Sequence, residues 1–108
     1  MDVAKYCLSK DGAVEDYPFG NEVTVFKVDG KMFALTQAVD LPETINLKCD
    51  PIRAQILRQD HPEIAPGYHM NKSHWNTLDL KGKLPDSLIR ELIDHSYDLV
   101  APKLRSRR

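Results

Sequence analysis

The stretch VTVFKVDGKMFALT, residues 23–36, decides the fold expected of this chain. Val23 to Val28 has the composition of a β-strand. Asp29-Gly30 is the two-residue signal for a type I′ turn, because both central residues of that turn need a positive φ. The chain then returns as a second strand, in which strict alternation would separate two sets of side chains, Met32, Ala34 and Thr36 on one face and Phe33 and Leu35 on the other. The sequence therefore predicts an antiparallel hairpin.

Two further strands are predicted C-terminal to this hairpin. Thr44 to Lys48 alternates with Ile45 and Leu47 inward, and Trp75 to Leu80 alternates with Trp75 and Leu78 on opposite faces. The segments 13–20 and 62–67 contain proline and glycine and are predicted to be loops, with Tyr17 and Phe19 of the first folding back onto the core. A strand partner near residues 65–70 is compatible with the pattern but not required by it.

Three helices are predicted around these strands. Asp2 to Lys10 forms the first, and Asp50-Pro51 begins the second with a good N-cap and a proline at the first helical position. His61-Pro62 ends that second helix. Its expected buried stripe is Ile52, Ile56 and Leu57. The longest helix runs from Pro85 to about Ala101, with an apolar stripe at helical spacing made of Leu88, Ile89, Leu92, Ile93, Tyr97 and Val100. The expected fold class is α+β, an antiparallel sheet with helices packed on one face.

The length and composition favour an ordinary globular protein. The 108 residues predict one domain over residues 1–102 and a basic tail over residues 103–108. No run of about 18 apolar residues predicts a membrane span, and the start lacks the apolar stretch of a signal peptide. Cys7 and Cys49 are far apart in the sequence and are expected to be buried free thiols. We therefore expect a cytoplasmic monomer without membrane association.

The charge balance does not favour a strong nucleic-acid binder. Fifteen Lys and Arg residues against sixteen Asp and Glu residues give a net charge of −1, whereas a dedicated DNA-binding domain often has a pI above about 9. The charge is unevenly distributed. Residues 1–47 hold four lysines and eight acidic residues, and residues 48–108 hold eleven basic and eight acidic residues. This asymmetry permits a basic face.

The stretch GYHMNKSHWNTLDL, residues 67–80, concentrates the polar candidates for function. It holds the only tryptophan, Trp75, together with two histidines, a lysine, and several short amides and hydroxyls. A polar loop that leads into an anchored strand is a common location for a binding site. The same residue types also cap helices and form turns, and Trp75 is equally compatible with a plain core position.

The sequence does not favour an enzyme or a metalloprotein. His69 and His74 are five residues apart, which does not match the spacing of the His-Glu-x-x-His zinc motif. Cys49 has no nucleophile motif around it, and the chain lacks a glycine-rich phosphate loop. Asp94, His95 and Asp98 are expected to form a solvated helix face. We expect no catalytic residues, no cofactor and no metal.

Several segments in order resemble the MmcQ/YjbR family of small bacterial proteins. The matching segments are YPFG at 17–20, VFKVDGKMFAL at 25–35, INLKCDP at 45–51, the central stretch 67–80, and LPDSLIRELIDHSYDLV at 84–100. The resemblance covers nearly the whole chain apart from the basic tail. It implies a frataxin-like (CyaY-like) α+β fold and a double-wing mode of DNA binding. The acidic iron-binding ridge of frataxins is not matched, because the first helix mixes Asp2 and Asp11 with Lys5 and Lys10.

The first functional hypothesis is therefore a non-enzymatic DNA-binding protein. The wings would be the loop from His69 to Trp75 and the turn from Lys81 to Lys83, with Arg53 and Arg58 as further phosphate contacts. Lysines would contact phosphate and the amides would reach base edges. The candidate nucleic-acid-binding residues are His69, Asn71, Lys72, Ser73, His74, Trp75, Asn76, Lys81 and Lys83.

The alternative is a protein-interaction or small-ligand module. Its pocket would lie beside the sheet and would be lined by Tyr68, His69, Asn71 and Trp75. Two observations separate the hypotheses. An exposed Trp75 ring would offer a stacking platform for bases, and basic side chains gathered on one face would favour phosphate binding.

Overall fold

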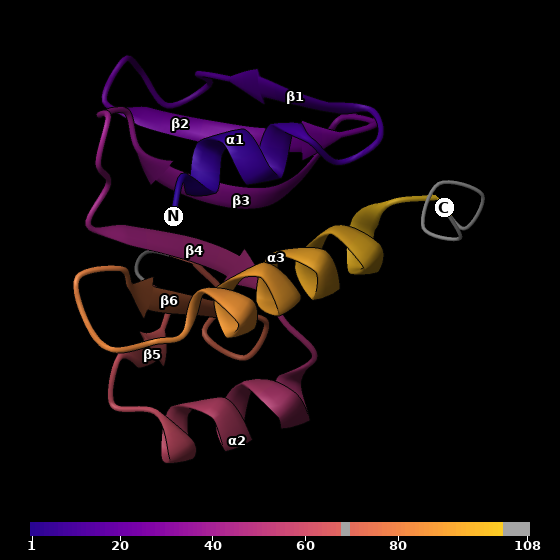
Figure 1. The fold of residues 1–108 in the computed structure, drawn as a ribbon. Coiled ribbons are helices and arrows are strands. Elements are labelled where there is room, and N and C mark those ends of the chain that lie inside the picture. The colour runs from indigo at the N-terminus through magenta and orange to yellow at the C-terminus, as the bar shows by residue number, and fades with distance from the viewer. Residues whose placement is uncertain (68–69, 103–108) are drawn as a thin grey trace.

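The computed structural model describes residues 1–67 and 70–102, and within them the strands form one antiparallel sheet of six (Figure 1). The strand order is β1-β2-β3-β4-β6-β5. The strands are β1 (Ala13–Asp16), β2 (Val23–Val28), β3 (Lys31–Gln37), β4 (Thr44–Lys48), β5 (Ile64–Pro66) and β6 (Trp75–Asp79). The helices are α1 (Val3–Leu8), α2 (Pro51–Asp60) and α3 (Asp86–Val100). This confirms the predicted α+β fold class. The tail at 103–108 lies outside the described residues.

The predicted hairpin is confirmed, but its side-chain alternation is not. Asp29 and Gly30 have φ of 48° and 79°, as a type I′ turn requires, and Val28 pairs with Lys31 across the turn. A β-bulge follows, because Lys27 pairs with Met32 while Phe26 pairs with Ala34. The extra residue in β3 is Phe33, so Phe33 and Ala34 both enter the main core while Met32 and Leu35 share the other face.

Two segments predicted to be loops contain short edge strands instead. β1 pairs with β2, and β5 pairs with β6 at the opposite edge of the sheet. Each pairs with only one neighbour, so most of its side chains stay exposed and its sequence lacks the apolar alternation of a central strand. Tyr17 and Phe19 after β1 do not fold back as plugs, since they are 44% and 61% exposed.

The main core lies between the sheet and the two helices α1 and α3, which lie on the same face of the sheet (Figure 1). The predicted stripe of α3 is confirmed, with Leu88 only partly buried. The rings of Tyr97 and Phe33 pack edge to face, with 5.5 Å between their centroids. The hydroxyl of Ser96, fully buried, donates to the Phe33 carbonyl at 2.5 Å and accepts the Lys48 N–H at 2.9 Å. These two hydrogen bonds fix the distance of α3 from β3 and β4.

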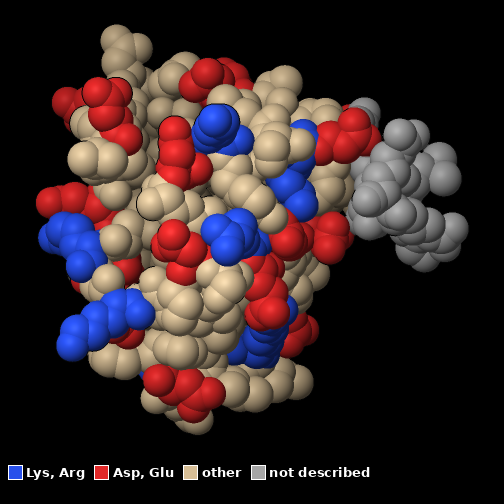
Figure 2. Space-filling view, viewed as in Figure 1, with Lys and Arg blue, Asp and Glu red and all other residues tan. Residues whose placement is uncertain are grey.

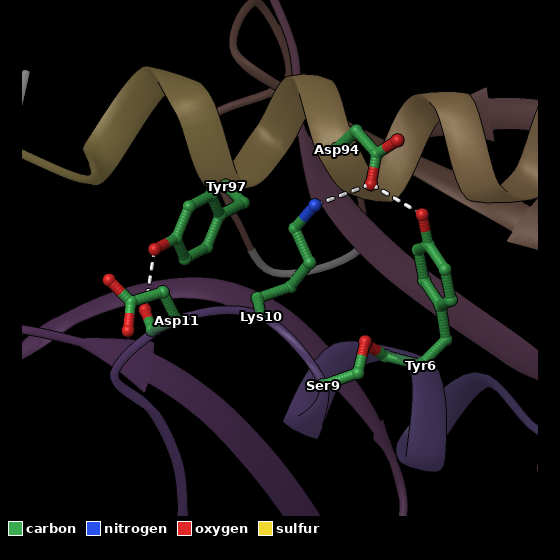
Figure 3. Close-up of polar contacts among 6 residues, drawn as sticks. All are labelled: Tyr6, Ser9, Lys10, Asp11, Asp94 and Tyr97. Atoms are coloured by element: carbon green, nitrogen blue, oxygen red, sulfur yellow. Dashed lines mark hydrogen bonds and ion pairs between the residues drawn. The ribbon is translucent and has the colours of Figure 1, made fainter. Parts of the chain in front are cut away.

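A polar cluster joins α1 to α3 (Figure 3). The Tyr6 hydroxyl and the Lys10 ammonium both donate to Asp94 Oδ1 at 2.7 Å, and Lys10 lies over the Tyr97 ring at 5.2 Å from its centroid. Burial, with the hydrogen bond to Asp94, raises the pKa of Tyr6 to about 12. Asp94 is therefore held in this cluster although its side chain is 42% exposed, and of the three residues expected on a solvated face only Asp98 is fully on the surface. His95 also has a partner, because its Nε2 accepts the Asp50 N–H at 3.1 Å.

The ends of α2 are as predicted, but of its predicted buried stripe only Leu57 is buried. Asp50 caps the helix by accepting the Arg53 N–H, and the helix ends before His61. The buried residues are Ala54 and Leu57, whereas Ile52 and Ile56 are 72% and 51% exposed. The reason is that α2 lies at the end of the sheet that carries β5 and β6 (Figure 1), so only a narrow face of the helix is covered.

The two cysteines are buried free thiols, as expected. Burial raises the pKa of the Cys7 thiol to about 12, which keeps it protonated and weakly nucleophilic near neutral pH. Cys49 lies at the start of α2, and burial raises the pKa of its thiol as well. Within the described residues no helix is long and apolar enough to cross a membrane.

Candidate functional site

The face of the sheet opposite α1 and α3 carries a second, smaller apolar cluster. Directly paired residues of an antiparallel sheet point to the same face, and Val25 pairs with Leu35, Leu35 with Asn46, and Lys48 with Trp75. Val25, Leu35 and Trp75 form the buried part of this cluster. Partly buried Val23, Met32 and Met70 pack around it. We call this the open face, because within the described residues no helix packs on it.

A pocket of about 520 Å³ lies on the open face. This volume is within the usual range for small-molecule sites. None of the lining residues that the structure describes carries a charge, and the lining is largely apolar. The residues that line the pocket are Phe19, Val23, Met32, Leu35, Thr36, Gln37, Asn46, Met70, Asn71 and Trp75.

The loop of residues 71–74 forms one wall of the pocket. It is held by hydrogen bonds within itself, to Arg58 and to Cys49. The Asn71 carbonyl accepts the N–H groups of His74 and Trp75, and Asn71 Oδ1 accepts the Ser73 N–H at 2.9 Å. Arg58 of α2 donates to the Lys72 carbonyl at 2.9 Å. The His74 carbonyl accepts the Cys49 N–H at 2.7 Å. The segment 71–74 is therefore a preformed turn anchored to α2 and to the end of β4.

Gly67, directly after β5, allows the chain at this point to approach Trp75 of β6 closely. The Gly67 N–H donates to the Trp75 carbonyl at 2.8 Å, and a Cβ added at Gly67 would lie 2.7 Å from the Cβ of Trp75. No real side chain tolerates that distance without a shift of the backbone. Glycine at this position therefore sets the depth at which the Trp75 side chain sits in the sheet.

Three amides of the described pocket lining, Gln37, Asn46 and Asn71, have their oxygens occupied. Asn46 Oδ1 lies 2.5 Å from the Thr77 hydroxyl, which donates to it, and Asn71 Oδ1 accepts the Ser73 N–H. Gln37 is used on both ends, since its Nε2 donates to Thr44 and its Oε1 accepts the Glu43 and Thr44 N–H groups. Asn46 and Asn71 therefore face the pocket as hydrogen-bond donors.

The structure places the predicted residues of the central stretch in different environments. Trp75 is only 8% exposed and belongs to the pocket floor, so it is not a stacking platform on the surface. Asn76 points to the helix side of the sheet, is 2% exposed, and accepts from Arg58 at 3.1 Å. Its Nδ2 has no partner among the described residues. It is therefore not available to read a base, which corrects that expectation.

The remaining residues of the predicted first wing are on the surface. Asn71, Lys72, Ser73 and His74 are exposed. Tyr68 and His69, which belong to both hypotheses, lie outside the described residues. Asn71 is thus the one exposed residue of the first wing that also lines the pocket.

The predicted basic groups do not form one patch of free cations. Lys81 lies 3.5 Å from Glu43. Lys83 is exposed and bonds to Glu63 with its backbone N–H, a contact that does not involve its ammonium group. Arg53 forms an ion pair with Glu91 at 2.6 Å, and Arg58 anchors the loop described above. Figure 2 shows Lys and Arg interspersed with Asp and Glu on the helix-bearing face.

Most of the pocket residues were missed by sequence analysis. Of the ten lining residues that the structure describes, only Asn71 and Trp75 were candidate site residues. One signal in the sequence points to the other lining residues. Apolar residues occur on both faces of β2 and β3, but helices are predicted on one face only, so Val23 and Leu35 on the opposite face are not packed against a helix. Phe19 carries no such signal because it lies in a loop. Among the described residues no group of three His, Cys, Asp or Glu could hold a metal ion.

The family model named YjbR matches residues 8–99. The chain belongs to the YjbR family. It is 38% identical over 96 residues to the uncharacterized protein YjbR of Escherichia coli K12, a match that covers 89% of this chain and 81% of the relative. The uncharacterized protein YyaQ of Bacillus subtilis is 31% identical, with 91% and 94% covered.

The structural comparison gives the same family. A crystal structure of a Deinococcus radiodurans protein with the DUF419 domain superposes with a TM-score of 0.86 at 40% identity, covering 97% of this chain and 83% of that one. The family resemblance recognised in the sequence is thereby confirmed, together with the α+β fold.

Proposed function

We propose that this YjbR-family chain is a non-enzymatic binding module whose ligand enters the pocket on the open face. The observation that carries the proposal is the pocket itself: about 520 Å³, with an apolar floor at Leu35 and Trp75 and a wall formed by a preformed turn. Pre-formed concave sites of this size with few polar groups are typical of ligand binding. Trp75 is the only tryptophan of the chain, so its fluorescence reports on the site directly.

The test uses the neutral apolar probe N-phenyl-1-naphthylamine. We expect the probe to bind at one site with energy transfer from Trp75. Val23→Phe, which extends an aromatic ring into the pocket, should weaken binding about tenfold or more, since the ring occupies the ligand's volume. The matched control is Ile52→Phe on the exposed face of α2, which should leave the affinity unchanged. Equal affinity of both variants, or no saturable binding, would overturn the proposal.

We propose DNA binding as a second candidate, supported by the arrangement of the lysines around β6. Lys72 precedes this strand and Lys81 and Lys83 follow it, and all three are exposed. A five-residue strand spans about 14 Å, close to the width of about 12 Å of the major groove. Two lysine-bearing loops at this separation suit contacts to phosphates on both sides of a groove.

A salt titration of binding to random duplex DNA tests this second candidate. The double variant Lys72→Ala/Lys81→Ala should weaken binding to all sequences alike and lower the magnitude of the salt slope by about two, one for each phosphate contact. Lys31→Ala at the tip of the β2–β3 hairpin is the control and should change neither. Absence of salt-dependent retention by the wild-type protein at low ionic strength would eliminate the hypothesis.

A further inference from the structure

We infer that the pocket on the open face takes a neutral, flat apolar molecule that carries a carbonyl-type hydrogen-bond acceptor. This inference rests on the proposed ligand-binding function and specifies the class of ligand. Its evidence is the chemistry of the lining: uncharged walls, an aromatic and thioether floor, and two amides that present donors.

The absence of charge among the described lining residues selects against ionised ligands. A carboxylate or ammonium that enters the pocket loses hydration, and none of these ten residues offers an opposite charge in return. The nearest lysines of the open face are engaged or lie outside the lining: Lys27 pairs with Asp16 at 2.9 Å, and Lys48 is not among the lining residues. A neutral ligand avoids this desolvation cost.

The apolar part of the lining favours a flat aromatic body. Trp75 supplies an aromatic surface, while Met32 and Met70 supply thioether side chains from β3 and from the loop before β6. Methionine side chains adapt their shape and make favourable contacts to aromatic rings. Phe19, 61% exposed, stands at the pocket margin, where it can cover a bound ring.

The polar part of the lining selects for an acceptor. The orientation of the Asn71 amide follows from its partner, because the Ser73 N–H can only donate and therefore bonds to Oδ1, leaving the NH₂ group as the free end. Asn46 Oδ1 accepts the Thr77 hydroxyl at 2.5 Å, a much shorter contact than the 3.4 Å between that hydroxyl and the Pro66 carbonyl, so the NH₂ group of Asn46 is left as a donor. A ligand oxygen of the ketone, ester or amide type would satisfy either donor, whereas a ligand that carries only donors would find an acceptor among the described lining side chains chiefly in the Thr36 hydroxyl.

Three matched probes test each part of the inference: 2-acetylnaphthalene, 2-ethylnaphthalene and 2-naphthoate. They share the aromatic body and differ in having a neutral acceptor, no acceptor, or a charged acceptor. The affinities are measured in two ways. One is titration calorimetry, and the other is displacement of bound N-phenyl-1-naphthylamine, followed as a loss of energy transfer from Trp75. We expect the ketone to bind about tenfold or more tightly than either of the other two compounds.

The variants Asn71→Asp and Asn46→Asp identify the donors. Each keeps an oxygen for its internal partner, Ser73 N–H or the Thr77 hydroxyl, so that the turn and the sheet are preserved, but each loses the NH₂ group. The readout is the ratio of ketone to ethyl affinity, in which the ethyl compound serves as internal control. We expect at least one variant to reduce this ratio to about one. A ratio unchanged in both variants would overturn the role of the amides.

The outcomes separate this inference from the function on which it rests. If all three probes displace N-phenyl-1-naphthylamine equally well, or the naphthoate binds most tightly, the pocket binds ligands but the inferred class is wrong. If neither the indicator nor any probe binds, the proposed function itself fails. Tighter binding of the ketone together with loss of selectivity in the Asn→Asp variants supports both.

Discussion

Replacing Leu92 by alanine is expected to lower the free energy of unfolding by about 2–5 kcal/mol, the usual range for truncating a buried leucine. Leu92 is 4% exposed and lies in the middle of the α3 stripe that covers the sheet. Its removal leaves a cavity between α3 and the strands, and Ser96 and Tyr97 on the same helix are held by bonds that restrict its collapse. Urea unfolding followed by far-UV circular dichroism measures the difference.

The matched control is Leu99→Ala in the same helix. Leu99 is 44% exposed, so its truncation creates no enclosed cavity and should cost about 0.5 kcal/mol or less. The two variants make the same chemical change in the same helix, so helix propensity cancels between them. A loss below about 1 kcal/mol for Leu92→Ala, or equal losses in both, would mean that the stripe is not the main core face.

Local signals in the sequence were enough to predict the central part of the fold. The Asp29-Gly30 turn and the Asp50-Pro51 helix start depend on backbone conformations that their own residues favour, so no distant contact was needed. The α3 stripe was also predictable, because six apolar positions at helical spacing leave one face to bury.

The features that sequence analysis missed depend on tertiary contacts. The bulge at Phe33 turns that ring into the core against Tyr97, more than sixty residues away. Helical periodicity predicted that Ile52, Ile56 and Leu57 are buried, but the position of α2 at the end of the sheet covers Leu57 together with Ala54 and leaves Ile52 and Ile56 exposed. An edge strand such as β1 forms because its backbone pairs with the free N–H and C=O groups of the neighbouring strand, and its own side chains contribute less.

The candidate site was only partly predictable for a similar reason. The stretch around Asn71 and Trp75 was recognised because short hydrogen-bonding side chains gather there beside the only tryptophan. Met70 lies in the same stretch, and the other lining residues come from β2, β3, β4 and the loop after β1, which the order of the strands brings together. The burial of Trp75, which the sequence left open, decides between a surface for stacked bases and a pocket floor.

Gly67→Ala is the second prediction with a large expected effect, a loss of about 1–3 kcal/mol in the free energy of unfolding, as is typical of overpacking. The added Cβ would meet three atoms of Trp75, its Cβ at 2.7 Å, its carbonyl oxygen at 3.2 Å and its carbonyl carbon at 3.3 Å. Two of these atoms are backbone of β6, so the clash is relieved only by separating the chain at Gly67 from β6. That movement lengthens the Gly67 N–H to Trp75 carbonyl bond.

The matched control for this prediction is Gly82→Ala in the turn after β6. The added Cβ there would lie 2.6 Å from Cγ of Glu63, so this side chain must turn away and give up its bond to the Lys83 N–H, while the backbone stays in place. The cost should therefore stay near that of one exposed hydrogen bond, about 0.5–1 kcal/mol. Because Trp75 forms the pocket floor, Gly67→Ala should also shift the fluorescence of Trp75 and weaken the binding of the probe N-phenyl-1-naphthylamine. Gly82→Ala should do neither. Equal stability of the two variants would show that β5 and β6 yield to the extra methyl group. The position of the Trp75 side chain would then be set by Val25 and Leu35, with which it forms one cluster, and not by the neighbouring glycine.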